Sequence, residues 1–187
     1  MPVRALLWSI FVAVSAIAQC APDAAAVLQH PVYKYRGLYQ NRAYGFSVMI
    51  PKGFVGLYNR DPNYVRGFTI LLADRKASVT VTAPVNSREY PDARAAAEGA
   101  LQHYEKHGRK ILSSNFEQTK TGDRPAVALR VRYTCPPSGT EYLAVETLAV
   151  RDNVHSITWE GPASAFDETS RELIEELKRT WKFIEVK

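Results

Sequence analysis

The sequence predicts an α+β fold, a mostly antiparallel β-sheet flanked by helices with the element order ββββ-α-ββββ-α. Two observations predict it. Apolar residues recur at every second position in short runs, several of them separated by turn residues, which indicates strands linked by hairpins. Two other segments carry apolar residues at spacings of three and four, which is typical of amphipathic helices. Strands interrupted and followed by single helices favour an antiparallel sheet with the helices packed on it.

Four strands are predicted before the first helix. They are Tyr44–Ile50, Phe54–Tyr58, Phe68–Leu72 and Ser78–Val85. In the first strand the alternate residues Phe46, Val48 and Ile50 share one face with Tyr44, and Pro51 follows at once, where a strand would end. In the last strand valines alternate with serine and threonine, so one of its faces is predicted to be buried.

The first helix is predicted over Ala93–His107. Its apolar stripe consists of Ala93, Ala96, Ala97, Ala100, Leu101 and Tyr104. Asp92 is suited to cap the start, and Gly108 is suited to end the helix in a left-handed turn.

The second half repeats the pattern: in Ala126–Thr134 the apolar residues Val127, Leu129, Val131 and Tyr133 are predicted to face one way, and Arg130 and Arg132 the other. Its four predicted strands are Ile111–Thr119, Ala126–Thr134, Glu141–Arg151 and Val154–Trp159, with a tight turn at Asp152-Asn153 between the last two. The closing helix has an inner stripe that runs from Phe166 through Leu173 and Leu177 to Trp181, with Ser164 as its expected cap.

The first 18 residues are predicted to be a signal peptide. A single arginine, Arg4, precedes the uncharged run Ala5–Ala18, which is shorter than the roughly 20 residues that span a bilayer. The run ends in Ala16-Ile17-Ala18, a small-residue cleavage pattern before Gln19. The alternative is an uncleaved anchor helix. Residues 19–32 are then expected to be a flexible tether, and residues 33–187 a single domain.

Export gives the two cysteines three alternatives. Cys20 carries a lipid anchor, forms a disulfide with Cys135 in an oxidising compartment, or stays a thiol. Gln19 stands where a lipid-attachment sequence has a small residue, which weakens the lipoprotein interpretation. Membrane association is expected only if Cys20 is acylated.

The sequence excludes several classes of catalytic site. It has no Gly-rich phosphate loop and no GxSxG nucleophile motif, so neither a nucleotide-binding loop nor a serine hydrolase is predicted. No cofactor is expected. His103 and His107 are four residues apart in HYEKH, but Tyr104 stands where a zincin has glutamate and no third ligand is identifiable. No metal site is predicted, and Cys135 lies at a predicted strand end without the features of a catalytic thiol.

Carboxylates on strands leave one enzyme hypothesis open. Glu141, Glu146 and Glu160 lie on predicted strands, and Glu146 stands out because its neighbours are apolar. A hydrolase site near Glu146 and His155 is the alternative to a binding role. The favoured interpretation of Glu146 is a solvated position on the outer face of an edge strand.

The segment Tyr33–Gly45 is the predicted binding surface. It places four tyrosines among three cations, and rings beside cations can stack on sugars and pair with anionic groups. The predicted binding residues are Tyr33, Lys34, Tyr35, Arg36, Tyr39 and Arg42. The alternative is that the segment packs on the sheet with its tyrosines half-buried.

The stretch from Tyr44 to Phe54, YGFSVMIPKGF, resembles the opening strand and turn of the PsbP-like family. The late hairpin before a C-terminal helix, and the aromatic pair Trp181 and Phe183 at the end of that helix, resemble the same family. The resemblance spans roughly residues 35–186 and implies an antiparallel sheet flanked by helices. It also implies a binding or assembly role, since most members of the family are not enzymes.

We therefore expect an exported, non-catalytic binding or assembly domain of the cell envelope. Its expected partner is an envelope protein or an anionic envelope polymer, because the formal net charge is +5 and export excludes nucleic acid. A structural lipoprotein anchored through Cys20 is the remaining alternative.

Overall fold

The computed structural model describes residues 32–59, 66–72, 76–136 and 139–186. The predicted signal peptide, most of the predicted tether and Cys20 lie outside these residues. The elements in chain order are β1 (Val32–Tyr35), β2 (Gly37–Asn41), β3 (Phe46–Ile50), β4 (Gly56–Asn59), β5 (Gly67–Leu72), β6 (Ala77–Thr82), α1 (Ala93–Lys106), β7 (Lys110–Thr121), β8 (Arg124–Thr134), β9 (Glu141–Val150), β10 (Val154–Pro162), the 3₁₀ turn η3 (Ala163–Ala165), α2 (Glu168–Thr180) and β11 (Lys182–Phe183).

The described strands form two antiparallel sheets. The large sheet has eight strands in the order β1-β4-β5-β6-β10-β9-β8-β7, and the small one has three in the order β11-β3-β2. The predicted α+β class with a mostly antiparallel sheet is confirmed. Consecutive strands β7 to β10 are neighbours, as hairpin connections require, while β6 pairs with β10 and thereby joins the two halves of the chain.

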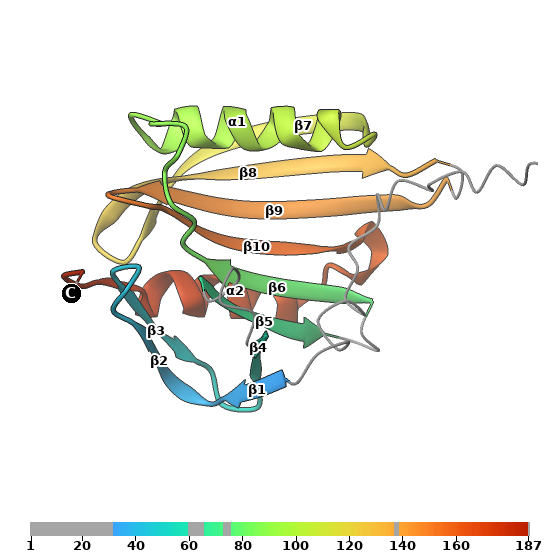
Figure 1. Ribbon diagram of the computed structural model, residues 1–187. Coiled ribbons are helices and arrows are strands. Elements are labelled where there is room, and N and C mark those ends of the chain that lie inside the picture. The colour runs from blue at the N-terminus through green and yellow to red at the C-terminus, as the bar shows by residue number, and fades with distance from the viewer. Residues whose placement is uncertain (1–31, 60–65, 73–75, 137–138, 187) are drawn as a thin grey trace, which may run out of the picture.

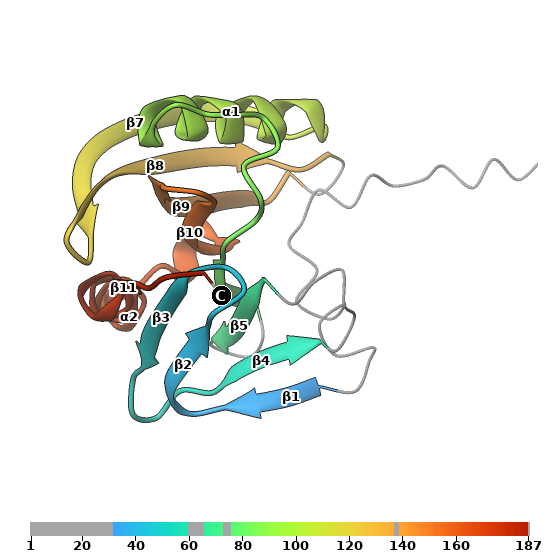
Figure 2. The ribbon, with the colours of Figure 1, turned by 60° about the vertical axis from the view of Figure 1, so that its left-hand side comes forward.

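The two helices cover opposite faces of the large sheet. Helix α1 lies along β8 and β9, and α2 lies on the other side, against β10 and the small sheet (Figures 1 and 2). Each face therefore has its own hydrophobic core.

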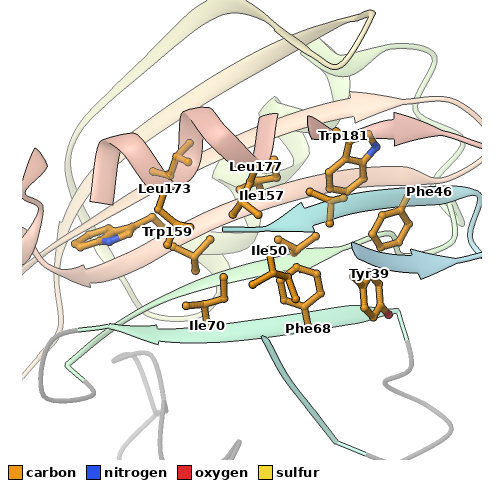
Figure 3. Packing of buried hydrophobic residues seen from close by; sticks show 14 of the residues in the cluster. Tyr39, Phe46, Ile50, Phe68, Ile70, Ile157, Trp159, Leu173, Leu177 and Trp181 are labelled. Atoms are coloured by element: carbon orange, nitrogen blue, oxygen red, sulfur yellow. The ribbon is translucent and has the colours of Figure 1, made fainter. Parts of the chain in front are cut away.

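The larger core lies between α2, the small sheet and strands β5, β6 and β10 (Figure 3). Trp159 is fully buried beneath α2, and Leu173 and Leu177 point toward the sheet from the helix. Phe46 of β3 stacks on Trp181, with ring centroids 4.6 Å apart and planes 10° from parallel. This contact fixes the small sheet to the end of α2.

The smaller core lies between α1 and strands β8 and β9. The alternation predicted for β8 is confirmed: Leu129, Val131 and Tyr133 are fully buried on this face, while Arg130 and Arg132 are exposed on the other. The α1 side of the sheet is also where the polar residues of the candidate site gather.

The segment before Tyr44 contains strands that the sequence pattern did not predict. β1 pairs with β4, and β2 pairs with β3. The first half therefore has six strands where four were expected. Both extra strands are short, VYKY and GLYQN, and their lysine, glycine and amide residues leave little of the apolar alternation that marks a strand.

The start of α2 differs from its prediction. Asp92 caps α1 as expected, by accepting a hydrogen bond from the backbone N–H of Ala95 at 2.8 Å. The cap of α2 is Asp167, whose carboxylate accepts from the N–H of Ser170 at 2.8 Å, so the predicted Ser164 cap is wrong. Ser164 instead lies in η3, a separate turn before the helix.

Candidate functional site

A cavity of about 420 Å³ lies between α1 and the large sheet. Its floor is formed by β9 and β10, one wall by α1, and the opposite wall by the chain between β6 and α1. The lining is unusually rich in groups that ionise or donate hydrogen bonds. Those side chains are Asn86, Ser87, Arg88, Tyr90, His103, Tyr104, Arg109, Glu146, Thr158 and Glu160.

Strand alternation places Glu146 on the cavity floor. Ala144 and Leu148, two residues to either side of it on β9, belong to the smaller core under α1. Glu146 therefore faces α1 as well. In the register of β9 and β10 it lies directly opposite Thr158.

Glu146 is partly buried and has a raised pKa of about 7. Burial is the largest cause, because it disfavours the ionised form, and the nearby charge of Glu160 adds to it. Hydrogen bonds from Thr158 and Tyr104 act in the opposite direction. The expectation of a solvated position on an edge strand is wrong: β9 lies between β10 and β8, and this face of it is covered by α1.

Glu160 of β10 is the second carboxylate on the floor. Arg109 Nη1 lies 2.8 Å from its Oε1, and the Tyr133 hydroxyl donates to the same oxygen at 2.5 Å. The Arg109 and Glu160 side chains are only 15% and 17% exposed, so solvent screens this ion pair less than one on the surface. The charge of Glu160 is thus balanced within the site.

The end of α1 positions Arg109. Gly108 has a φ of 75°, in the left-handed region that glycine adopts without strain, and this turn directs the chain back over the sheet. The Arg109 guanidinium then lies 4.4 Å from the Tyr104 ring centroid and 4.8 Å from that of Tyr133. Both rings stabilise the cation and hold it against Glu160.

Tyr104 connects the helix to the floor. Its ring is 5% exposed, and its pKa is raised well above the ordinary value, first by burial and then by the charges of Glu146 and Glu160. The hydroxyl therefore stays protonated over the physiological range and acts as a hydrogen-bond donor to Glu146.

The outer wall is held by side chain to backbone hydrogen bonds. Asn86 Nδ2 donates to the carbonyl of Tyr90 at 2.9 Å, and its Oδ1 accepts from the Tyr90 N–H at 2.9 Å. The Tyr90 ring lies against α1 at Gly99, where a Cβ would be only 2.0 Å from the Tyr90 hydroxyl oxygen. Glycine in mid-helix thus makes room for the ring that forms this wall.

The mouth of the cavity is basic. Arg88 is exposed there and donates to the Tyr90 hydroxyl at 3.1 Å. The pKa of His103 is lowered by desolvation, then by His107 and by the cations Arg109, Arg88 and Lys106, so this imidazole is neutral at pH 7. The His103 and His107 rings lie 4.1 Å apart, but the described residues hold no group of three or more His, Cys, Asp or Glu that could bind a metal ion.

His155 does not belong to this cavity. It lies on β10 between Val154 and Ser156, with its ring on the α2 side, 4.9 Å from the Phe183 ring and 5.9 Å from the Phe46 ring. A single site near Glu146 and His155 is therefore wrong, because the two side chains occupy opposite faces of the sheet. Burial, followed by the charge of Arg151, lowers the pKa of His155 to about 4.

The predicted tyrosine-rich binding surface is divided between core and solvent. Tyr39 is 5% exposed and belongs to the larger core, where burial raises its pKa to about 12. Tyr35 is half-buried and packs between Tyr39 and Tyr58, while Tyr33 is 40% exposed. The charged residues of the set, Lys34, Arg36 and Arg42, are exposed. The tyrosines of this segment thus pack on the sheet to different extents, while its lysine and arginine side chains are exposed to solvent.

Cys135 lies at the end of β8, 4% exposed in the smaller core. Its predicted partner Cys20 is outside the described residues, so their pairing stays a prediction.

Sequence reasoning named Glu146 and Glu160 as candidate carboxylates but did not place them together, and it did not connect Tyr104 with them. Glu160 and Tyr104 lie 14 and 42 positions away along the chain from Glu146, and only the strand register and the helix position bring them to it. One signal was available: Glu146, Thr158 and Glu160 share a sheet face with apolar neighbours. Polar residues at alternate, otherwise apolar positions indicate a buried polar site.

Three solved structures resemble this one. Cyanobacterial PsbP (CyanoP) from Synechocystis sp. PCC 6803 aligns with a TM-score of 0.50 at 11% identity, covering 81% of this chain and 92% of that one. The fold is PsbP-like. A protein of Bacteroides thetaiotaomicron aligns with a TM-score of 0.42 at 14% identity, covering 79% of this chain and 48% of that one. LpqN of Mycobacterium tuberculosis, described as involved in cell envelope biogenesis, aligns with a TM-score of 0.45 at 10% identity. The alignment covers 87% of this chain and 96% of that one.

No family model and no curated protein sequence matches this chain. The likeness of the fold to CyanoP nevertheless agrees with the PsbP-like resemblance of the sequence. Within the part of the chain that the structure describes, neither helix is both long enough and apolar enough to cross a membrane.

Proposed function

We propose that this protein is an exported, ligand-binding domain of the cell envelope, and that the cavity between α1 and the sheet is its binding site. The observation that carries the proposal is Glu146, a carboxyl group held on the floor of a cavity with a pKa of about 7. A protein gains no stability from a carboxyl group in such a position, because ionising it in a desolvated place costs free energy. Perturbed groups that converge in a cavity are typical of functional sites.

Export rests on residues 1–18, whose charged start, apolar centre and Ala16-Ile17-Ala18 end are those of a cleavable signal. The mass of the protein recovered from cells tests it. Loss of 18 residues supports export by signal cleavage, and an intact Met1 argues against it. The same spectrum distinguishes an acyl group on Cys20 from a disulfide, which removes two hydrogens.

Ligand retention tests the binding site. We would purify the protein from the envelope fraction without denaturation and compare its native mass spectrum with that of Ala100→Phe, whose added ring projects from α1 into the cavity. Gln102→Phe, on the exposed side of the same helix, is the matched control. A small molecule carried by wild type and Gln102→Phe and lost from Ala100→Phe supports the proposal. A ligand-free wild type, or one that keeps its ligand in Ala100→Phe, contradicts it.

A hydrolase is a second candidate, since Glu146 with its raised pKa lies beside a second carboxylate, Glu160. Two carboxyl groups in different environments can divide the roles of proton donor and base. On this hypothesis Glu146 gives its proton to a leaving group. Glu146→Gln would then abolish turnover of a bound ester or glycoside while retaining binding, and wild-type protein that only binds such compounds argues for the non-catalytic role.

The exposed cations of the N-terminal strands support a second contact, with an envelope protein or an anionic envelope polymer. Lys34, Arg36 and Arg42 are exposed, and Tyr33 and Tyr35 lie beside them. Co-sedimentation with cell-wall polymer tests this contact. Lys34→Glu with Arg36→Glu would abolish it, whereas unchanged sedimentation of that double variant would exclude this surface.

A further inference from the structure

The distribution of charge in the α1–sheet cavity carries an inference about its ligand, which rests on the proposed binding function. The floor holds two carboxylates, Glu146 and Glu160, and one guanidinium, Arg109, which pairs with Glu160. Among residues 32–59, 66–72, 76–136 and 139–186, no ion pair joins Glu146 to a cation. The floor is therefore one positive charge short when Glu146 is ionised.

Glu146 has hydrogen-bonding capacity left for a ligand. Its protein donors are the hydroxyls of Thr158 and Tyr104, and an ionised carboxylate offers about four acceptor positions. An ammonium group brings three donors and a full positive charge. An ammonium group would therefore donate to the acceptor positions of Glu146 that Thr158 and Tyr104 do not occupy. It would also bring the positive charge that the cavity floor lacks.

The mouth has the opposite sign. Arg88 lies there in solvent, its partner being the neutral Tyr90 hydroxyl, and Lys106 lies on the adjoining turn of α1. His103 is neutral and adds no charge. A ligand that carries only a cation would meet repulsion on the way in, whereas an acidic group at the outer end of the ligand would pair with Arg88.

We propose that the cavity binds a small zwitterion, with its ammonium group on Glu146 and Glu160 at the floor and its carboxylate or phosphate group at Arg88 in the mouth. The volume of about 420 Å³ accommodates a molecule of the size of an amino acid or a phosphorylated amino alcohol. The zwitterion reaches the cavity either as a free solute or as the head group of a lipid.

Binding of this ligand depends on pH through Glu146. The charged and titratable groups around the cavity are Arg88 and Tyr90 on the chain before α1, Tyr104 and His103 on α1, Arg109 after it, Tyr133 on β8 and Glu160 on β10. Glu146, with a pKa of about 7, changes charge near neutrality while it faces the ammonium. Affinity is thus expected to rise between pH 6 and pH 8, as Glu146 loses its proton.

Four soluble probes separate the two ends of the ligand. Phosphoethanolamine carries both charges, ethanolamine only the ammonium, glycerol phosphate only the phosphate, and glycerol neither. We expect phosphoethanolamine to bind at least tenfold more tightly than any of the others at pH 8, by ¹H–¹⁵N NMR titration, with shifts confined to residues 84–90, α1, β9 and β10.

Two variants test which residue contacts the ammonium end of the ligand and which contacts the phosphate end. Glu146→Gln should weaken both phosphoethanolamine and ethanolamine about tenfold, while Arg88→Gln should weaken phosphoethanolamine and leave ethanolamine unchanged. Glu117→Gln and Lys120→Gln, which exchange exposed charges on β7, are the matched controls. Vesicles of phosphatidylethanolamine with phosphatidylglycerol, compared with phosphatidylglycerol alone, distinguish a lipid head group from a free solute.

Equal affinity for glycerol and phosphoethanolamine, or tight binding of glycerol phosphate that survives Glu146→Gln, would overturn the zwitterion inference. So would the absence of binding by every probe. The proposed function itself still stands in those cases if wild-type protein carries a molecule that Ala100→Phe loses, and fails if it carries none.

Discussion

Glu146 of β9 lies directly opposite Thr158 of β10 and accepts a hydrogen bond from its hydroxyl on the floor of the cavity. This pair sits in the interior of the sheet, on the face that α1 covers. Several of its neighbours on that face, among them Leu129, Ala144 and Leu148, are apolar. The site therefore costs the fold some stability, and this cost can be measured.

Replacing Glu146 by glutamine should stabilise the protein at high pH. The folded-state pKa of about 7 lies above the ordinary 4.5, so the stabilising effect of the protonated form is complete below pH 4.5 and is lost as the pH rises through 7. Linkage sets an upper limit of about 3 kcal/mol at pH 8, and partial solvent exposure reduces the expected gain to roughly 1–2 kcal/mol. Urea unfolding at pH 5 and pH 8 measures it. The control Glu117→Gln, an exposed change, should alter the free energy of unfolding little at either pH. If Glu146→Gln also alters it little at pH 8, Glu146 is solvated.

Replacing Arg109 by methionine should destabilise the protein by about 2 kcal/mol, because it leaves Glu160 partly buried with no cation. The methionine retains much of the contact with the Tyr104 and Tyr133 rings. Adding Glu160→Gln should restore most of the loss, since no unpaired charge then remains. If the double variant is no more stable than the single one, packing and not charge explains the role of Arg109.

The protein should lose stability in mild acid through His155. Its folded-state pKa of about 4 is below the ordinary 6.5, so the contribution of the neutral ring is complete above pH 6.5 and is lost as the pH falls toward 4. At pH 5 the loss is about 2 kcal/mol. His155→Phe keeps an aromatic ring among Phe46, Trp181 and Phe183 and should remove this part of the acid sensitivity. Gln102→Ala, an exposed change that removes no titratable group, should leave the pH profile of unfolding unaltered.

Gly99→Ala should separate stability from binding. Alanine favours the helix by about 1 kcal/mol over glycine, but its Cβ would lie 2.0 Å from the Tyr90 hydroxyl oxygen and must displace that ring. We expect thermal stability close to wild type, shifted Tyr90 NMR signals and weaker ligand retention. Retention equal to that of a Gln102→Ala control would exclude Tyr90 from the site.

The sequence predicted most of the fold because its strands and helices carry regular apolar periods. Alternation in β8 and the stripe of α2 each determine which face is buried, and the structure agrees with both. β1 and β2 were missed, since both are short and their lysine, glycine, glutamine and asparagine residues interrupt the apolar alternation. The segment was consequently interpreted as a binding surface, although Tyr39 is part of the core.

The candidate site was less predictable for a different reason. Its members come from α1, β9 and β10 and from the turn after α1, and their meeting depends on strand order. Glu146 was noticed but interpreted as solvated, because a single sequence does not show that β9 is an interior strand. His155 was grouped with it, although the register of β10 places the His155 ring on the other face.

The pKa of Glu146 tests the account most directly, since the cavity, its charge balance and both proposals depend on a desolvated carboxyl group at that position. A ¹³C NMR titration of the side-chain carboxyl carbons, with Glu146→Gln to assign the signal, measures it. The account predicts a midpoint of about 7. A midpoint near the ordinary 4.5 would contradict it, because Glu146 would then be a solvated surface residue.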